Sequence, residues 1–413
     1  MARCYIIRAA QQHGWAGLGA LNDIPLSLYI HFPWCVKKCP YCDFNSHTRK
    51  GELPEQAYVD ALIQDFSQQI NNIGQRKIQT IFIGGGTPSL ISATQINRLL
   101  ETLRQSNRLQ DDIEITLEAN PGAIDASHFD AYLAAGVNRL SIGVQSLNDD
   151  SLKQIGRIHS VKDTHQAIER AHTAGFKRIN LDIMYGLPEQ NLQASKQDIE
   201  QAIALSEQYN IRHLSVYQLT IEPNTEFAVR PPKLPDSEQY WDMQLQAQAL
   251  LQSAEFTQYE VSAYSQEDQC QHNLNYWHFG DYLAIGAGAH GKLSKLDSND
   301  TLVIERYWNH RHPNAYLKAS QAASFIAKTK AVPNSDIDFE YLMNALRLKQ
   351  GFALSDYASR THHQPKALID KLSSFIEQGY LESNLQRIWA TQKGYQYLDT
   401  ILVECLPEPA TKS

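Results

Sequence analysis

The chain of 413 residues is 43% apolar, so it can bury a large core and is long enough for two domains. Its formal net charge of −8 argues against broad binding to a nucleic-acid backbone, which needs clustered Lys and Arg. The sequence has no apolar run of the roughly 20 residues that cross a bilayer, and residues 1–22 lack the apolar core of a secretory signal. These features predict a cytoplasmic protein with no nucleic-acid partner.

Up to about residue 300, short β-branched runs alternate with amphipathic helical stretches. Strands are predicted at 26–30, 80–83, 114–118, 139–144, 179–184 and 213–219. Helices are predicted near 59–70, 91–104, 125–135, 161–174 and 192–207. Six βα units in sequence imply right-handed crossovers and a parallel sheet with helices outside it. The periodicity leaves open whether that sheet is doubly wound or curled into a barrel.

Beyond about residue 300 the alternation fades, and short helices with a small hairpin take its place. Apolar stripes predict helices around 339–346 and 368–376, the second of them ended by Gly379. A hairpin over 380–390 and a last helix near 393–403 complete a winged-helix-like order. Because basic residues are few, a packing or lid module is favoured over a DNA-binding one. The predicted divisions are a loose extension at 1–22, a first domain at 23–300, a helical domain at 301–406 and a tail at 407–413.

Three of the six cysteines, Cys35, Cys39 and Cys42, lie within eight residues, directly after the first strand. Thiols stay reduced in the cytosol, so this group indicates metal binding rather than disulfides. Thiolates suit zinc or an iron–sulfur cluster. Structural zinc prefers four protein ligands, and His31 or His47 could complete such a site. Three cysteines without an obvious fourth fit better a cubane whose remaining iron is open to a small ligand.

Glycines and polar residues gather at the ends of the later strands, where barrel enzymes place their ligands. They are Gly85, Gly86 and Thr87 after the second strand, Glu118 at the end of the third, Gln145 and Arg157 after the fourth, and Asp182 on the fifth. A glycine-rich turn lets backbone approach a ligand closely. Each feature also has a structural explanation, namely a tight turn, an exposed strand end, or an ion pair between Arg157 and Asp182. Their common rim favours a ligand site.

The C-x3-C-x2-C spacing after a first strand resembles the signature of the radical S-adenosylmethionine (SAM) superfamily. This resemblance implies a [4Fe–4S] cluster on the three cysteines, with SAM chelating the open iron. One electron from the cluster would cleave SAM to a 5′-deoxyadenosyl radical. The implied α/β fold is a partial (βα)6 radical SAM barrel, followed by a small, mainly helical, winged-helix-like C-terminal domain.

From about residue 26 to 403 the chain resembles the oxygen-independent coproporphyrinogen III oxidase family. The matching strings are YIHFPWC at 29–35, GGGTP at 84–88, GVQS at 143–146, GRIH at 156–159 and DIMYGLP at 182–188. By this resemblance the cluster-bound SAM site would be lined by Tyr29, Gly85, Thr87 and Glu118, with Gly86 in the same turn. The positions of Gln145, Arg157 and Asp182 match those that hold a second SAM in the true dehydrogenase.

One departure from that family changes the implied function. The dehydrogenase has Gly-Cys after its third cysteine, whereas this chain has Asp43-Phe44, which puts decarboxylation in doubt. The string HNLNYW at 272–277 resembles the haem-binding HNxxYW motif of the HemW haem chaperones within this family. An imidazole beside large aromatic rings suits the iron and the apolar macrocycle of haem.

The haem-binding residues implied by this motif are His272, Asn273, Tyr276 and Trp277. Two alternatives stay open. The aromatic residues could simply pack the barrel opening around a satisfied His272, or the iron ligand could be Cys270 or His290.

The HemW resemblance implies a chaperone that receives haem from a donor protein and transfers it to haem-requiring apoproteins, with membrane respiratory enzymes among the candidates. Catalysis beyond an ability in principle to cleave SAM stays uncertain, because no coproporphyrinogen oxidation is implied. Cluster loading and homodimer formation would go together, and any membrane association would be peripheral, through partners at the inner face. The alternatives are a coproporphyrinogen III dehydrogenase using two SAM molecules and a zinc-stabilised winged-helix regulator.

Overall fold

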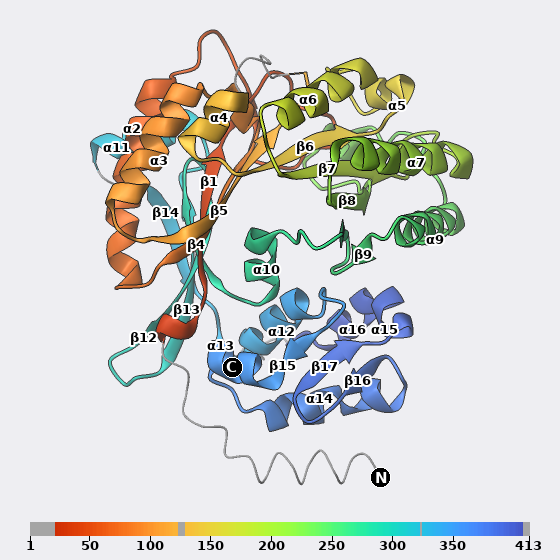
Figure 1. Cartoon of the computed structure of the whole chain (residues 1–413). Helices are drawn as coiled ribbons and strands as arrows, with labels where there is room; N and C mark the ends of the chain where they lie inside the picture. The colour runs from red at the N-terminus through yellow and green to blue at the C-terminus, as the bar shows by residue number, and fades with distance from the viewer. Residues whose placement is uncertain (1–20, 123–128, 323, 408–413) are drawn as a thin grey trace.

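The computed structural model describes residues 21–122, 129–322 and 324–407, so the predicted extension and tail lie almost wholly outside it (Figure 1). One mixed sheet of twelve strands runs through the larger part of the molecule, in the order β14-β13-β12-β11-β1-β4-β5-β6-β7-β8-β10-β9. Its last two strands are the short β10 (Ala263–Ser265) and β9 (Thr257–Gln258). The sheet ends at β14 on one side and at β9 on the other, so it is an open, partial barrel. No described helix is long and apolar enough to cross a membrane.

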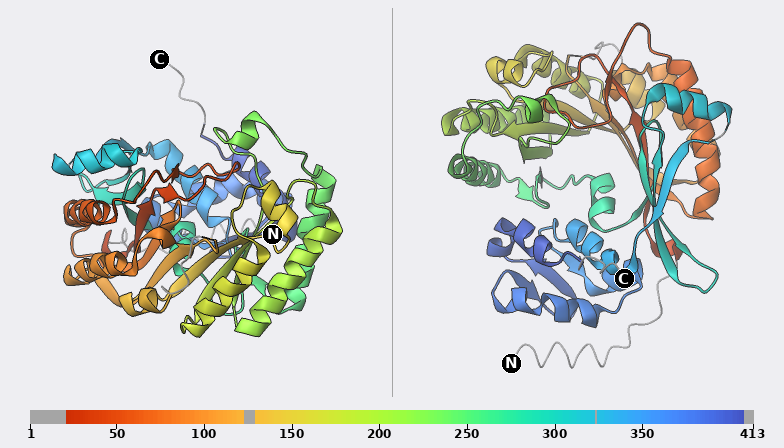
Figure 2. Two further views of the ribbon diagram at one scale, coloured as in Figure 1. Left: turned by 90° about the horizontal axis from the view of Figure 1, so that it is seen from above. Right: turned by 180° about the vertical axis from the view of Figure 1, so that it is seen from behind.

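Six neighbouring parallel strands form the middle of the sheet, as the alternation predicted. They are β1 (Leu26–Phe32), β4 (Ile78–Gly85), β5 (Leu109–Ala119), β6 (Arg139–Gln145), β7 (Arg178–Tyr185) and β8 (His213–Gln218). The helices that cover their outer face are α2 (Glu55–Gln69), α3 (Ala93–Gln105), α4 (Phe129–Ala135), α6 (Val161–Thr173), α7 (Leu192–Tyr209) and α9 (Ser237–Ser253) (Figure 2). Because these strands are parallel, the carboxyl ends of all six lie at the same rim of the barrel.

Four further strands extend the sheet beyond β1. They are β11 (Asp281–Ile285), parallel to β1, followed by β12 (His290–Leu296), β13 (Leu302–Asn309) and β14 (Ile326–Ala331), each antiparallel to the strand before it. Two of these strands lie past residue 300, where the sequence analysis ended the first domain. We propose that the boundary lies between β14 and the next helix, near residue 332.

The remaining residues form a helical domain below the barrel, drawn blue in Figure 1. Its elements are α12 (Asn334–Ala345), β15 (Phe352–Ala353), α13 (Leu354–Thr361), α14 (Pro365–Glu377), β16 (Leu381–Ser383), β17 (Arg387–Ala390), α15 (Gln392–Gln396) and α16 (Leu398–Glu404). Leu342, Leu368 and Ile388 are fully buried in its core. The order of these elements confirms a winged-helix-like domain. Two short helices, α15 and α16, take the place of the single last helix that was predicted. Gly379 follows α14 with a φ of 72°, the left-handed conformation expected after a helix.

Candidate functional site

The three clustered cysteines lie in the loop after β1, at the carboxyl rim of the barrel. Within this loop, β2 (Trp34–Cys35) pairs with β3 (His47–Thr48), and Cys42 N–H donates to Cys39 O at 3.1 Å. All three thiols line one cavity of about 470 Å³. Burial raises the pKa of the Cys35 thiol to about 11, so this sulfur becomes a thiolate only when a metal displaces its proton.

The donor groups around this loop fit a cluster better than a single zinc ion. Among the described residues, no three His, Cys, Asp or Glu side chains form a group that could hold one metal ion. The His31 Nε2 lies 2.9 Å from Asn45 O and must donate to it, so Nδ1 accepts from Tyr29 Oη at 2.8 Å. Neither nitrogen of His31 is free for zinc. In an iron–sulfur cubane each thiolate binds a different iron, so the three need not converge.

The glycine turn after β4 packs directly against the cysteine loop. Gly85 has a φ of 120°, and a Cβ there would come within 2.6 Å of the His31 ring. A Cβ on Gly86 would lie 2.4 Å from Trp34 O. Close packing therefore accounts for both glycines. The same turn brings Thr87 into the cavity and lets Gly85 N–H donate to Glu118 Oε2 at 2.9 Å.

Two carboxyl groups face the cysteines across this cavity. Burial, reinforced by the nearby Asp182, raises the pKa of Glu118 to about 8. Burial also raises the pKa of Asp182, which accepts hydrogen bonds from Ser141 Oγ at 2.9 Å and Asn180 Nδ2 at 2.8 Å. A cationic ligand would favour the ionised form of both groups. SAM, with its ammonium and sulfonium groups, fits this pair.

The structural alternative for Arg157 and Asp182, an ion pair between them, is not formed. Arg157 Nη2 donates to Gly143 O at 2.7 Å, and its Nη1 lies 3.9 Å from Cys39 Sγ. Gln145 has a φ of 69°, unusual for a residue with a side chain, and its Oε1 accepts from Tyr217 Oη at 2.7 Å. Tyr217 lines the cavity but was missed from the sequence, because a single tyrosine in a predicted strand carries no motif.

A second, larger cavity of about 760 Å³ lies beside the first, inside β11, β12 and β13. Asp43 and Phe44 line both cavities, so the loop after the cysteines separates them. Tyr29, which was predicted for the SAM site, lines the larger cavity. Burial raises the pKa of Tyr29, and the charge of the nearby Glu118 raises that pKa further. The aromatic wall of this cavity includes Tyr276, Trp277, Phe279, Tyr282 and Trp308.

The HNxxYW segment forms α10 (Gln271–Trp277), which contacts β1, β4 and α12. Only Tyr276 and Trp277 of the motif line the larger cavity, and Asn273 lines neither one. His272 is fully buried, with Nδ1 2.8 Å from Thr80 Oγ1 and Nε2 2.8 Å from Tyr276 Oη. Burial lowers its pKa to about 3. In this structure His272 is therefore a hydrogen-bonded core residue, and it has no nitrogen free for the iron ligation that the resemblance implied.

The pKa of Glu118 leads to a prediction about stability. The folded chain keeps this carboxyl protonated up to about pH 8, whereas the unfolded chain loses the proton above about pH 4.3. Stability is therefore lost as pH rises through that window. We expect Glu118→Gln, which stays neutral, to be more stable than wild type at about pH 8 and to lose this advantage near pH 4. Urea unfolding without SAM tests this, and an advantage independent of pH would contradict it.

Known proteins share this architecture. A model of the radical SAM superfamily matches residues 29–202, and a model of the HemN C-terminal domain matches residues 332–397. The heme chaperone HemW of Haemophilus influenzae is 46% identical over 93% of this chain and 98% of its own length. HemW of Escherichia coli is 44% identical, covering 93% of this chain and 99% of that protein. The structure of coproporphyrinogen III oxidase (HemN) from Escherichia coli matches with a TM-score of 0.77 at 22% identity. The match covers 98% of this chain and 93% of that one, so the two proteins share a fold.

Proposed function

Since this chain belongs to the HemW heme chaperone family of radical SAM proteins, we propose that it binds haem and transfers it to haem-requiring apoproteins. The observation that carries this proposal is the aromatic cavity beside the cysteine loop. Its volume of about 760 Å³ lies within the range of about 300–1,000 Å³ typical of small-molecule sites. Its rings offer the broad apolar contact that a flat macrocycle needs.

Membership of the radical SAM proteins implies a [4Fe–4S] cluster and SAM. We propose Cys35, Cys39 and Cys42 as the cluster ligands. When bound, the cluster supplies the electron that can cleave SAM. The Arg157 guanidinium, 3.9 Å from Cys39 Sγ, would offset part of the negative charge of the thiolate-bound cluster.

The polar wall of the smaller cavity would hold SAM. We propose that Glu118 and Asp182 receive its cationic groups and that Thr87, in the turn after β4, provides a polar contact. Gly85 and Gly86 let this turn approach the cluster loop closely. Gln145 would contribute an amide at the far side, positioned by its hydrogen bond to Tyr217.

Coproporphyrinogen oxidation is the second candidate function, and the residue at position 44 argues against it. Phe44 stands where the dehydrogenase resemblance calls for a cysteine, and its side chain is 59% exposed at the junction of the two cavities. We propose that the protein does not carry out this oxidation. Anaerobic incubation with coproporphyrinogen III, SAM and a reductant tests the proposal. The expected result is unchanged coproporphyrinogen, whereas vinyl products would overturn it.

The partners follow from the same proposal. A haem donor protein would load the chain, and apoproteins, with membrane respiratory enzymes among the candidates, would unload it. Loading of the cluster would accompany homodimer formation. The protein would work in the cytoplasm, or at the inner face of the membrane when bound to its partners there.

Haem transfer can be measured directly. The protein, reconstituted with its cluster and loaded with one haem, is mixed with an apo-haemoprotein whose holo form has a distinct Soret band. We expect the acceptor spectrum to appear faster than with the same concentration of free haem, because a chaperone delivers haem without aggregation. Transfer no faster than from free haem would argue against a chaperone. Failure of the wild type to bind haem would refute the proposed function altogether.

A further inference from the structure

The larger cavity contains one histidine whose ring is free to bind a metal. His290 begins β12 and is exposed to the cavity, with its ring 5.6 Å from that of Trp308. Among the described residues, no group hydrogen-bonds to either of its ring nitrogens, in contrast to His31 and His272 on the same side of the barrel. Burial, together with the positive charges of Arg306 and Arg311, lowers the pKa of His290. A neutral imidazole is the form that ligates iron.

Aromatic residues surround the space in front of His290. Tyr276 and Tyr282 stand at 82° to each other with ring centroids 4.7 Å apart. Trp308 flanks His290, and Phe44, from the cysteine loop, also lines the cavity. These side chains come from four segments of the chain, so the cavity forms only in the folded protein. Apolar faces with one imidazole among them match the chemistry of an iron porphyrin.

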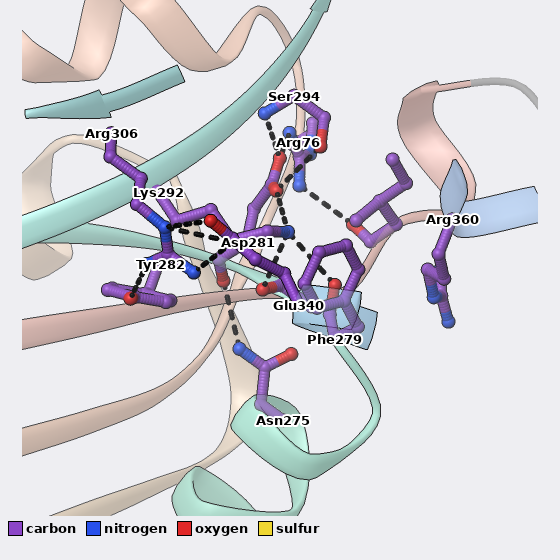
Figure 3. A network of polar contacts seen from close by, with 12 residues as sticks. Arg76, Asn275, Phe279, Asp281, Tyr282, Lys292, Ser294, Arg306, Glu340 and Arg360 are labelled. Carbon is purple, nitrogen blue, oxygen red and sulfur yellow. Dashed lines mark hydrogen bonds and ion pairs between the residues drawn. The ribbon is translucent and has the colours of Figure 1, made fainter. Parts of the chain in front are cut away.

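Most cations in this cavity already have partners. Lys292 Nζ lies 3.1 Å from Asp281 Oδ1 and donates to Phe279 O at 3.0 Å (Figure 3). Arg306 is paired with Glu340, at 2.6 Å between Nη2 and Oε2, as the same figure shows. Neither has a charge to spare for a ligand.

Arg311 is different. Within the described part of the chain it forms no ion pair, and its guanidinium makes one hydrogen bond, from Nε to Asn45 Oδ1 at 3.2 Å. Its two terminal nitrogens are thus available for a carboxylate. Arginine binds carboxylates through two parallel hydrogen bonds, and haem carries two propionates at one edge.

We propose that His290 is the protein ligand to haem iron in the larger cavity and that Arg311 binds a haem propionate. This assignment rests on the proposed function in haem carriage and gives that function a specific site. Tyr276 and Trp277 of the HNxxYW segment form part of the wall. His272 instead acts as a positioning residue that fixes Tyr276 and α10.

Haem titrations of four purified variants test this site. We expect His290→Ala to change the Soret and ferric electron paramagnetic resonance spectra and to weaken binding by at least about 10- to 100-fold, the loss that follows when only the groups orienting a metal ligand are mutated. Added imidazole should restore the wild-type spectrum, which a purely structural defect would not allow. Arg311→Gln should weaken binding by about tenfold with the iron spectrum unchanged, because only a charged hydrogen bond is lost. His165→Ala, on the exposed face of α6, is the matched control and should behave as wild type.

The fourth variant, His272→Gln, distinguishes the two histidines. Because its packing around Tyr276 changes, we expect weaker haem binding, but the axial-histidine spectrum of the wild type should be kept. A folded His272→Gln protein that loses this spectrum, together with an unchanged His290→Ala protein, would overturn the assignment while leaving haem carriage intact. Absence of haem binding by the wild type would instead refute the proposed function and this site with it.

Discussion

Replacing Cys39 by serine is expected to abolish the iron–sulfur cluster. Cys39 shares its cavity with Cys35 and Cys42, and a serine hydroxyl is neither soft nor readily deprotonated, so it cannot replace a thiolate on iron. The Arg157 guanidinium, 3.9 Å from Cys39 Sγ, would then face a neutral group. Iron and sulfide content after anaerobic reconstitution, with the visible absorbance of the cluster, measures the effect.

A second cysteine provides the control for this experiment. Cys405 is also buried, but in the core of the helical domain, and it lines neither cavity. Cys405→Ser should therefore retain the iron content of the wild type. Full iron in the Cys39 variant would rule out this residue as a cluster ligand. Equal iron loss in both variants would indicate a general effect of cysteine replacement.

The βα units could be predicted because the central parallel strands carry short, buried apolar runs, such as Ile81–Ile83 on β4 and Leu140–Val144 on β6. β14, beyond residue 300, does not have this pattern. β14 (Ile326–Ala331) is exposed along its whole length and carries two lysines, so nothing in its composition distinguishes it from a loop. Its place in the sheet depends on pairing with β13, which local periodicity cannot reveal. For this reason the sequence pattern predicted an end of the first domain at residue 300, ahead of β13 and β14.

The smaller cavity was largely predictable, because its residues follow parallel strands whose carboxyl ends meet at one rim. The larger cavity was not. It combines Tyr29, Phe44, Tyr276 and Trp308, which are far apart in the sequence and adjacent only through the order of the strands.

The HNxxYW segment shows a further limit of sequence patterns. The motif identifies suitable residue types, but the direction of a side chain depends on neighbours distant in sequence. His272 turns inward because Thr80, on β4, offers its hydroxyl there. His290, at the start of β12, lines the larger cavity instead. Only the three-dimensional arrangement separates a core histidine from an accessible one.

Asp281 stabilises the junction between the sheet and the larger cavity, and its replacement should have the largest effect on stability. Its side chain is fully buried and accepts from Arg76 Nη1 at 2.8 Å, Lys292 Nζ at 3.1 Å and both the N–H and the hydroxyl of Ser294 (Figure 3). Asp281→Ala would leave two buried cations without their counter-ion. Breaking a buried pair in this way costs about 3–5 kcal/mol, against about 5–15 kcal/mol for a whole domain.

The acid dependence of this effect has a definite sign. Burial alone would raise the pKa of Asp281, but Lys292, Arg76 and the Ser294 N–H outweigh it and lower the pKa below its ordinary value. The stabilisation is therefore fully present above the unfolded pKa of about 3.9 and is lost as pH falls through the lower folded value. Urea unfolding of wild type and Asp281→Ala should differ strongly at neutral pH and converge in acid. Asp150→Ala, which breaks an exposed pair with Lys153, should unfold like wild type. A similar small change in both variants would show that the Asp281 network contributes little to stability.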